Sequence, residues 1–228
     1  MRIRPALLIA LLPWAVAGQD LATPGDTLPA VATTKLATSL KEAAAHEKHV
    51  WRDTAPINPD GTVNGYIEIA RGDRQKWELN IGTNARVVDR MMPAELGGYP
   101  INYGIVPQTI SYDGDPFDVL VLGPPIEGGT LVRGVIVGLM LMEDEKGLDS
   151  KVVISRVDRN GKPTHALTPD IQRTVGDYFS RYKLHEPNAF SKVPGWGTAA
   201  DGLAWITTTH EFFRSCRERA GAPCTVKH

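Results

Sequence analysis

The sequence lacks the features that would point to a polymeric or lipid partner: an excess of positive charge, a basic tail, and any long run of like charges. Its 228 residues carry 25 basic and 26 acidic side chains, which gives a formal net charge of −1. Internal repeats and low-complexity tracts are also absent from the sequence. Because nucleic acids and anionic membrane surfaces attract basic segments, neither is indicated as a partner.

A membrane anchor is not indicated either, because the one marked apolar run, from Ala6 to Ala17, is short. A helix needs roughly 20 apolar residues to span a bilayer. Arg2 and Arg4 precede the run and small residues close it, which is the composition of a secretory signal peptide. A buried N-terminal helix is the alternative, but Pro13 would interrupt it. We therefore expect residues 1–17 to be a signal peptide, and the mature protein to be periplasmic or secreted.

Cysteine is scarce, and the two cysteines, Cys216 and Cys224, lie near the C-terminal end. Export would place them in an oxidising compartment, where disulfides persist. A disulfide and a pair of free thiols both stay open, since pairing requires a Cα separation that the sequence does not reveal. We favour the disulfide.

The first part of the mature chain divides into a linker and a helix. Residues 18–33 are small, polar and interrupted by proline, which is typical of a linker. Residues 34–48 are predicted to be helical, with Leu36 and Leu40 one turn apart. Residues 34–228 are long enough for one sizeable core and are predicted to form a single domain.

The middle of the chain favours β-strands. Alternating or branched aliphatic residues occupy segments 66–70, 76–80, 119–122, 131–142 and 151–157. No helical pattern separates these segments, so an antiparallel barrel is favoured over a doubly wound sheet. Two helices follow: one has Thr168 as its N-cap and Pro169 at its first position, and the other covers residues 203–219. The expected fold is mainly β, a barrel flanked by helices.

The clearest chemical signal is the segment Asp113-Gly114-Asp115-Pro116-Phe117-Asp118, which leads directly into an apolar strand. Gly114 and Pro116 favour a tight turn, which would bring three carboxylates together although they repel one another. The usual reason for such convergence is a hard divalent cation with oxygen ligands. A solvated acidic turn is the alternative, and it fits poorly with three aspartates that precede a buried strand.

Other charged residues accompany this segment. Further carboxylates are Glu68, Glu78, Asp144, Glu145 and Asp149, and each of them taken alone would be an ordinary solvated side chain. Cations and hydroxyl donors are supplied by Lys76, Arg90, Lys151, Lys183, Tyr99, Tyr103 and Tyr182. Such a mixture suits a polyphosphate that is held between metal ions and basic side chains.

These motifs together resemble the soluble family I inorganic pyrophosphatases. The resemblance runs from Tyr66 to Trp196 and includes the triple aspartate as well as shorter motifs in the same order. These are Ile67-Glu68-Ile69, Lys76-Trp77-Glu78, Val88-Asp89-Arg90, Tyr99-Pro100-Ile101-Asn102-Tyr103-Gly104, Asp144-Glu145, Asp149-Ser150-Lys151, Tyr182-Lys183 and Gly195-Trp196.

The resemblance implies a five-stranded OB-like β-barrel, Mg²⁺-dependent hydrolysis of inorganic pyrophosphate to two phosphates, and a homo-oligomer. Asp113, Asp118 and Asp149 look like ligands of the tightest metal ion, and Asp144 and Glu68 would help to hold further Mg²⁺. The phosphate-binding set would be Lys76, Arg90, Tyr103, Lys151, Tyr182 and Lys183, with Glu78, Tyr99 and Glu145 in support. Asp115 matches the general base.

The expected mechanism needs no covalent phosphoenzyme. A water that bridges two Mg²⁺ ions becomes hydroxide near neutral pH, and a neighbouring carboxylate can take its proton. Three departures from the family concern the leaving phosphate: Trp77 in place of a tyrosine, Arg71-Gly72 in the preceding turn, and Ala189 in place of a loop lysine.

Two rival readings remain. A haloacid-dehalogenase-like phosphatase would use Asp113 and Asp115 as its nucleophile motif, but it requires alternating strands and helices and forms an aspartyl phosphate. An OB-like binding module would use the barrel to hold an oligonucleotide or a protein, which the acidic character of the chain disfavours.

Export predicts a defined N-terminus for the mature protein. Intact-mass analysis of secreted material is expected to show a chain that begins near Gly18. A mass that retains residues 1–17, or protein found only in the cytosol, would contradict the prediction.

Overall fold

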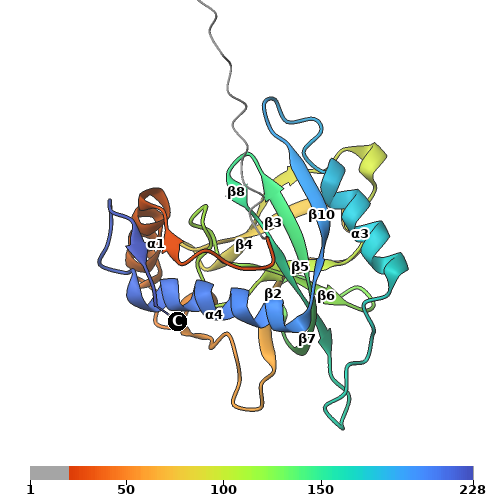
Figure 1. The fold of residues 1–228 in the computed structure, drawn as a ribbon, viewed down its shortest axis with the longest axis horizontal. Helices are drawn as coiled ribbons and strands as arrows, with labels where there is room; N and C mark the ends of the chain where they lie inside the picture. The colour runs from red at the N-terminus through yellow and green to blue at the C-terminus, as the bar shows by residue number, and fades with distance from the viewer. Residues whose placement is uncertain (1–20, 228) are drawn as a thin grey trace, which may run out of the picture.

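The computed structural model describes residues 21–227 and shows a mainly β fold with a few helices (Figure 1). The signal peptide predicted for residues 1–17 lies outside the described residues. Within residues 21–227, no helix combines the length and the apolar character that crossing a bilayer requires.

One large sheet forms the centre of the fold. Its strands are β2 (Val63–Ile69), β5 (Asn102–Ile105), β6 (Asp118–Leu122), β7 (Leu131–Asp144), β9 (Lys151–Arg156) and β10 (Ser191–Gly197), with β8 (Gly147–Leu148) beside β7. The strand order is β10-β7-β2-β5-β6-β9, and β9 also pairs with β7. The long strand β7 therefore contacts β2, β9 and β10 in turn, and it links both ends of the strand order.

The pairing of β6 with β9 is parallel, whereas the sequence favoured an antiparallel arrangement. The chain from β6 to β9 passes through β7, which serves as the crossover that a parallel pair requires. Val119 of β6 lies opposite Val152 of β9 in this register. The residues that precede them, Asp118 and Lys151, are therefore neighbours at the same end of the two strands.

Two helices cover the sheet. In α4 (Ala199–Ser215), Trp205 is fully buried and stacks on Phe117, with ring centroids 5.5 Å apart. In α3 (Pro169–Arg181), Val175, Tyr178 and Phe179 are buried, and α3 contacts β10. Aromatic side chains bury large apolar areas, so these contacts fix both helices against the strands (Figure 1).

The caps explain where these helices begin. Thr168 accepts a hydrogen bond from the Ile171 N–H, with Pro169 at the first position, which confirms the predicted start of α3. The start of α4 was predicted at Leu203, but the helix begins at Ala199. Thr198 and Asp201 form a capping box there, which supplies partners for the free N–H groups.

The chain before β2 is more ordered than a linker. Strand β1 (Thr27–Leu28) pairs with β11 (Cys224–Thr225), and α1 (Ala30–Ala43) follows it at once. The helix was predicted over residues 34–48; it begins earlier because Ala32 and Leu36 on one face are both buried. Cys216 and Cys224 form a disulfide with their Cα atoms 5.7 Å apart, and it lies in the same core cluster as α1.

The remaining elements are small. Helix α2 (Val50–Asp53) follows α1, strands β3 (Gln75–Asn80) and β4 (Ala85–Met91) form a hairpin, and a 3₁₀ turn η1 covers Ala94–Leu96. The hairpin lies against β2. Its two strands place Lys76 opposite Arg90.

The buried His49 predicts a loss of stability in acid. Its Nδ1 accepts hydrogen bonds from the Trp51 and Arg52 N–H groups, so Nε2 carries the proton that is donated to the Ile81 carbonyl oxygen. Burial lowers the pKa of His49. The contribution of His49 to the free energy of unfolding is therefore fully present above its unfolded-state pKa of about 6.5. It is lost as the pH falls, because the unfolded chain binds the proton more tightly than the folded protein does.

The measurement is urea unfolding of the wild type and His49→Asn at several pH values. Asparagine keeps a capping acceptor but does not titrate. The difference in unfolding free energy between the two proteins therefore isolates the effect of His49 titration. The stability advantage of the wild type is expected to shrink from pH 7.5 to pH 5.5. A difference that does not depend on pH would contradict this account.

Candidate active site

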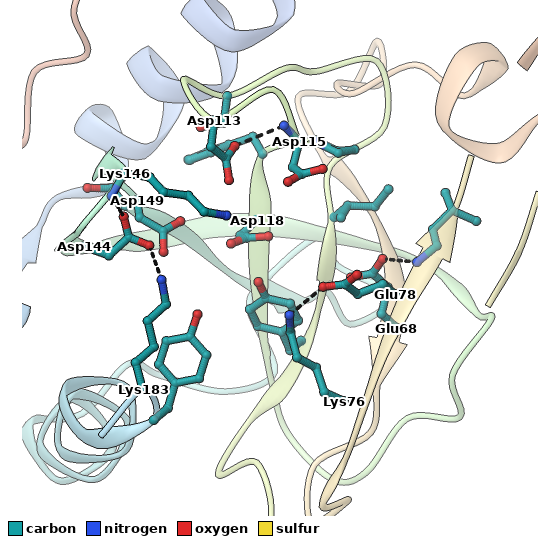
Figure 2. A pocket seen from close by; sticks show the side chains of 18 of the residues that line it. Glu68, Lys76, Glu78, Asp113, Asp115, Asp118, Asp144, Lys146, Asp149 and Lys183 are labelled. Atoms are coloured by element: carbon teal, nitrogen blue, oxygen red, sulfur yellow. Dashed lines mark hydrogen bonds and ion pairs between the residues drawn. The ribbon is translucent and has the colours of Figure 1, made fainter. Parts of the chain in front are cut away.

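A cavity of about 220 Å³ gathers most of the charged residues that the sequence singled out (Figure 2). It lies at the ends of β6, β7 and β9 and extends to the β3–β4 hairpin and the end of α3. Among the predicted site residues, those that line it are Glu68, Lys76, Glu78, Arg90, Tyr103, Asp113, Asp115, Asp118, Asp144, Glu145, Asp149, Tyr182 and Lys183.

The triple aspartate forms the tight turn that its sequence predicted. The Asp113 carboxylate accepts a hydrogen bond from the Asp115 N–H at 3.0 Å, and Gly114 has a φ of 83°. A second bond, from the Ser111 N–H to the Asp115 carbonyl oxygen at 2.7 Å, closes the turn. The turn presents Asp113, Asp115 and Asp118 to the same cavity.

Lys151 lies between two of the carboxylates. Its Nζ donates to Asp118 Oδ2 at 2.5 Å and to Asp149 Oδ1 at 2.9 Å. The Lys151 side chain is 1% exposed, so its charge is removed from water and depends on these partners. The parallel register of β6 and β9 creates this contact.

The site holds an excess of negative charge. Burial raises the pKa of Asp149 to about 7, and Asp118 adds to the rise while Lys151 opposes it. Burial alone would lower the pKa of Lys151, but Asp118 and Asp149 outweigh it and raise that pKa. Asp118 contributes to the rise of both pKa values, because a neighbouring carboxylate stabilises a proton or a cation on the groups around it.

Two lysines that line the cavity, Lys183 and Lys76, are also paired with carboxylates. Lys183 donates to Asp144 at 2.6 Å and to Glu145 at 2.9 Å, and the Lys183 and Asp144 side chains are 7% and 6% exposed. On the hairpin, Lys76 donates to Glu78 at 2.5 Å and to Asp89 at 3.0 Å.

Arg90 has a partner from a distant loop. Its guanidinium donates to Glu186 at 2.6 Å, and Glu186 lies beyond the end of α3. The same guanidinium reaches Asp89 at 3.1 Å. This contact joins the β3–β4 hairpin to the loop that follows α3, across the cavity that both line.

Glu68 lies under the hairpin and is 4% exposed. Its Oε1 accepts a hydrogen bond from the Leu79 N–H at 2.6 Å, and burial raises its pKa to about 8. The ring of Trp77 packs against the guanidinium of Arg86, whose Cζ lies 4.5 Å from the ring centroid. The Arg86 guanidinium in turn donates to the Glu68 carbonyl oxygen, so this pair ties the hairpin to β2.

The tyrosines differ in their positions. Tyr103 and Tyr182 line the cavity, and burial raises the pKa of both, so their hydroxyls stay protonated and can donate hydrogen bonds. Tyr99 is 1% exposed and packs behind Tyr103 with ring centroids 5.7 Å apart. It supports the wall of the cavity.

The donor set fits a hard divalent cation. Among residues 21–227, carboxylates but no histidine or cysteine line the cavity, and Mg²⁺ prefers oxygen ligands. Within residues 21–227, no group of three such side chains is already arranged to hold a metal ion. Lysine ammoniums form ion pairs with Asp118, Asp144 and Asp149.

Sequence reasoning missed several lining or contacting residues. Asp89 was read only as part of a motif with Arg90, and Glu186, Lys146 and Lys35 were not considered. Asp89 lies next to a predicted cation, which could have suggested it. Glu186 and Lys35 reach the site through the tertiary fold, and no local pattern indicates them.

The observed fold disagrees with the haloacid-dehalogenase-like alternative. A haloacid-dehalogenase-like fold alternates strands and helices, yet between β2 and β9 the described chain contains only the short turn η1 as helical structure. A mainly β domain that gathers carboxylates and cations in one cavity fits another class, the phosphoryl-transfer enzymes, whose sites neutralise phosphate charge with cations.

Comparison with known proteins gives the family. The inorganic pyrophosphatase family profile matches residues 65–214. The inorganic pyrophosphatase of Gluconobacter oxydans is 35% identical over 160 residues, which cover 65% of this chain and 92% of that protein. The one from Aquifex pyrophilus is 33% identical and covers 68% and 92%. The chain belongs to the inorganic pyrophosphatase family.

Solved structures of inorganic pyrophosphatases also resemble this chain. The inorganic pyrophosphatase of Coxiella burnetii matches with a TM-score of 0.65 and 35% identity, over 70% of this chain and 99% of that one. The Thermus thermophilus structure matches with a TM-score of 0.67 and 28% identity, over 74% and 100%.

The buried Lys151 predicts a stability change that metal reverses. Lys151→Met leaves Asp118 and Asp149 without their cation. Breaking a fully buried ion pair costs about 3–5 kcal/mol, and we expect a smaller cost here because the two carboxylates are 17% and 24% exposed. In the presence of chelator we expect Lys151→Met to be less stable than the wild type. With Mg²⁺ the loss of stability should be smaller, because the ion takes the place of the ammonium. Thermal unfolding with EDTA and with Mg²⁺ measures both.

Lys192→Met is the matched control, because Lys192 is 64% exposed and pairs with Glu143 outside the cavity lining. Exposed pairs contribute about 0–1 kcal/mol. If Lys151→Met proved no more harmful than this control, the ammonium would not be the neutralising group.

Proposed function

We propose that the chain hydrolyses inorganic pyrophosphate to two phosphates with the help of several Mg²⁺ ions and without a covalent phosphoenzyme. The observation that carries the proposal is the pairing of each proposed phosphate-binding cation with carboxylates of the same site. Lys76, Arg90, Lys151 and Lys183 are all held in this way.

These pairs explain why metal and substrate would bind together. A metal ion that takes Asp118 and Asp149 would leave the Lys151 ammonium without a partner, and a phosphate group can replace that partner. Pyrophosphate alone would instead leave carboxylates unpaired at a buried position. Each ligand therefore removes the cost that the other creates, so we expect positive coupling between Mg²⁺ and pyrophosphate.

The ligands divide by position. Asp113, Asp118 and Asp149 would hold the tightest ion, since all three line the same part of the cavity (Figure 2). Asp144 and Glu68 would hold further ions. Mg²⁺, when bound, neutralises phosphoryl oxygens and lowers the pKa of a water ligand.

The side chains perform the remaining chemistry. Asp115 accepts a proton from the attacking water, whose oxygen forms a bond to one phosphorus while the bridging P–O bond breaks. Lys76, Arg90, Lys151 and Lys183 neutralise the charge that develops on the two phosphates. Tyr103 and Tyr182 donate hydrogen bonds to phosphate oxygens. The second phosphate leaves without any bond to the protein.

Further points of the proposal rest on the topology and the disulfide. Strands β7, β2, β5, β6 and β9 pair in a ring, which supports a closed five-stranded OB-like barrel. The Cys216–Cys224 disulfide supports export, because disulfides persist in oxidising compartments.

The assembly of the chain into a homo-oligomer stays a prediction.

The function predicts strict dependence on Mg²⁺. Release of phosphate from pyrophosphate should cease with EDTA and return with Mg²⁺, while Ca²⁺ supports it poorly because its coordination is larger and looser. Equal turnover of a simple phosphomonoester would contradict the assignment.

The same assay separates the aspartates. Asp115→Asn keeps the shape and removes the base, so kcat should fall by roughly 10²- to 10⁴-fold with Mg²⁺ binding little changed. Asp118→Asn should weaken Mg²⁺ binding first and regain rate at high Mg²⁺. Calorimetric Mg²⁺ titration beside kcat measures both, and near wild-type kcat for Asp115→Asn would place the base elsewhere.

A further inference from the structure

Helix α1 reaches the active site from outside the matched region of the family. It covers Ala30–Ala43, whereas the family match begins at residue 65. The Lys35 Nζ on this helix donates to Asp115 Oδ1 at 2.6 Å. A segment that precedes the matched region therefore contacts the carboxylate proposed as the general base.

The turn that carries Asp115 rests directly on this helix. Gly114, with a φ of 83°, lies so close that a Cβ atom there would be 2.8 Å from Lys35 Cδ and 3.2 Å from Ala32 Cα. The aliphatic part of Lys35 thus packs on the turn while its ammonium reaches the next residue. Two contacts of different kinds fix the turn relative to α1.

The opposite face of α1 is fastened to the C-terminal segment. The Thr33 hydroxyl donates to the Ala222 carbonyl oxygen at 2.9 Å, and the Gly221 N–H donates to the Thr34 hydroxyl at 3.0 Å. Both partners lie in the loop that the Cys216–Cys224 disulfide closes. A helix held in this way can place an ammonium with little freedom of movement.

The ion pair itself contributes little to stability. The side chains of Lys35 and Asp115 are 46% and 52% exposed, and ion pairs this exposed are screened by water. An effect of Lys35 should therefore be visible in the reaction rather than in folding. This distinguishes it from the buried Lys151.

We propose that Lys35 is a positioning residue, which orients the Asp115 carboxylate through Oδ1 and leaves Oδ2 to accept the proton from water. This inference rests on the proposed function. Small displacements of a catalytic group lower rates strongly, by up to about 10²-fold for roughly 1 Å. The N-terminal helix and the disulfide-closed loop would then act together as the support of the general base.

The test begins with Lys35→Met, which keeps the aliphatic contact with Gly114 and removes the ammonium. We expect kcat for pyrophosphate to fall about 10- to 100-fold with KM nearly unchanged, because Lys35 would act through Asp115 and not on substrate. Lys35→Arg should restore most of the rate. Lys41→Met is the matched control, since Lys41 is exposed on the last turn of the same helix.

A double variant separates positioning from direct substrate contact. Lys35→Met added to Asp115→Asn should cause no further loss, since residues that act as a unit are not additive. Additive losses with a raised KM would mean that Lys35 binds substrate, and a wild-type kcat for Lys35→Met would overturn the inference.

Two measurements keep this inference separate from the proposed function. Turnover of pyrophosphate by the wild type tests that function alone. Crystal structures of the wild type and Lys35→Met show, without any turnover, whether the Asp115 carboxylate changes its orientation. An unchanged carboxylate would overturn the positioning role, and a lower melting temperature than that of Lys41→Met would indicate a structural role instead.

Discussion

Carboxylates that are buried or partly buried must be neutralised, and this requirement organises the site. Asp118 and Asp149 share the Lys151 ammonium, which is almost completely removed from water. Asp144 depends on Lys183 in the same way. A protein that keeps so many acids in one cavity needs either these cations or metal ions, and the exchange between them links metal binding to substrate binding.

The topology supplies the geometry for this exchange. The parallel pairing of β6 with β9 places Asp118 beside Lys151, and β7 carries Asp144 to the same end. The hairpin of β3 and β4 brings Lys76 and Arg90 to the opposite wall, where Glu186 completes the contact. The cavity thus lies where the ends of several strands meet.

The terminal segments add a second layer of support. Strands β1 and β11 pair, and the disulfide holds β11 to the end of α4, so the two ends of the described chain form one unit (Figure 1). This unit carries α1 to the triple-aspartate turn. Regions outside the matched family segment therefore take part in the arrangement of the site.

Local patterns were sufficient for the parts that depend on neighbours in sequence. The triple-aspartate turn and the Thr168 cap could be predicted, because turn formation and capping involve residues only a few positions apart. Most residues of the cavity were predicted from the resemblance of their motifs to a known family. Residues 27–33 were expected to form a linker and instead contribute β1 and the start of α1, whose order comes from pairing with the C-terminal strand. The parallel pairing of β6 with β9 was decided only by the tertiary structure, because strand pairing across an intervening strand has no local signal. The contacts of Glu186 with Arg90 and of Lys35 with Asp115 were decided in the same way, because ion pairs between residues 80 or more positions apart leave no periodic signal in the sequence.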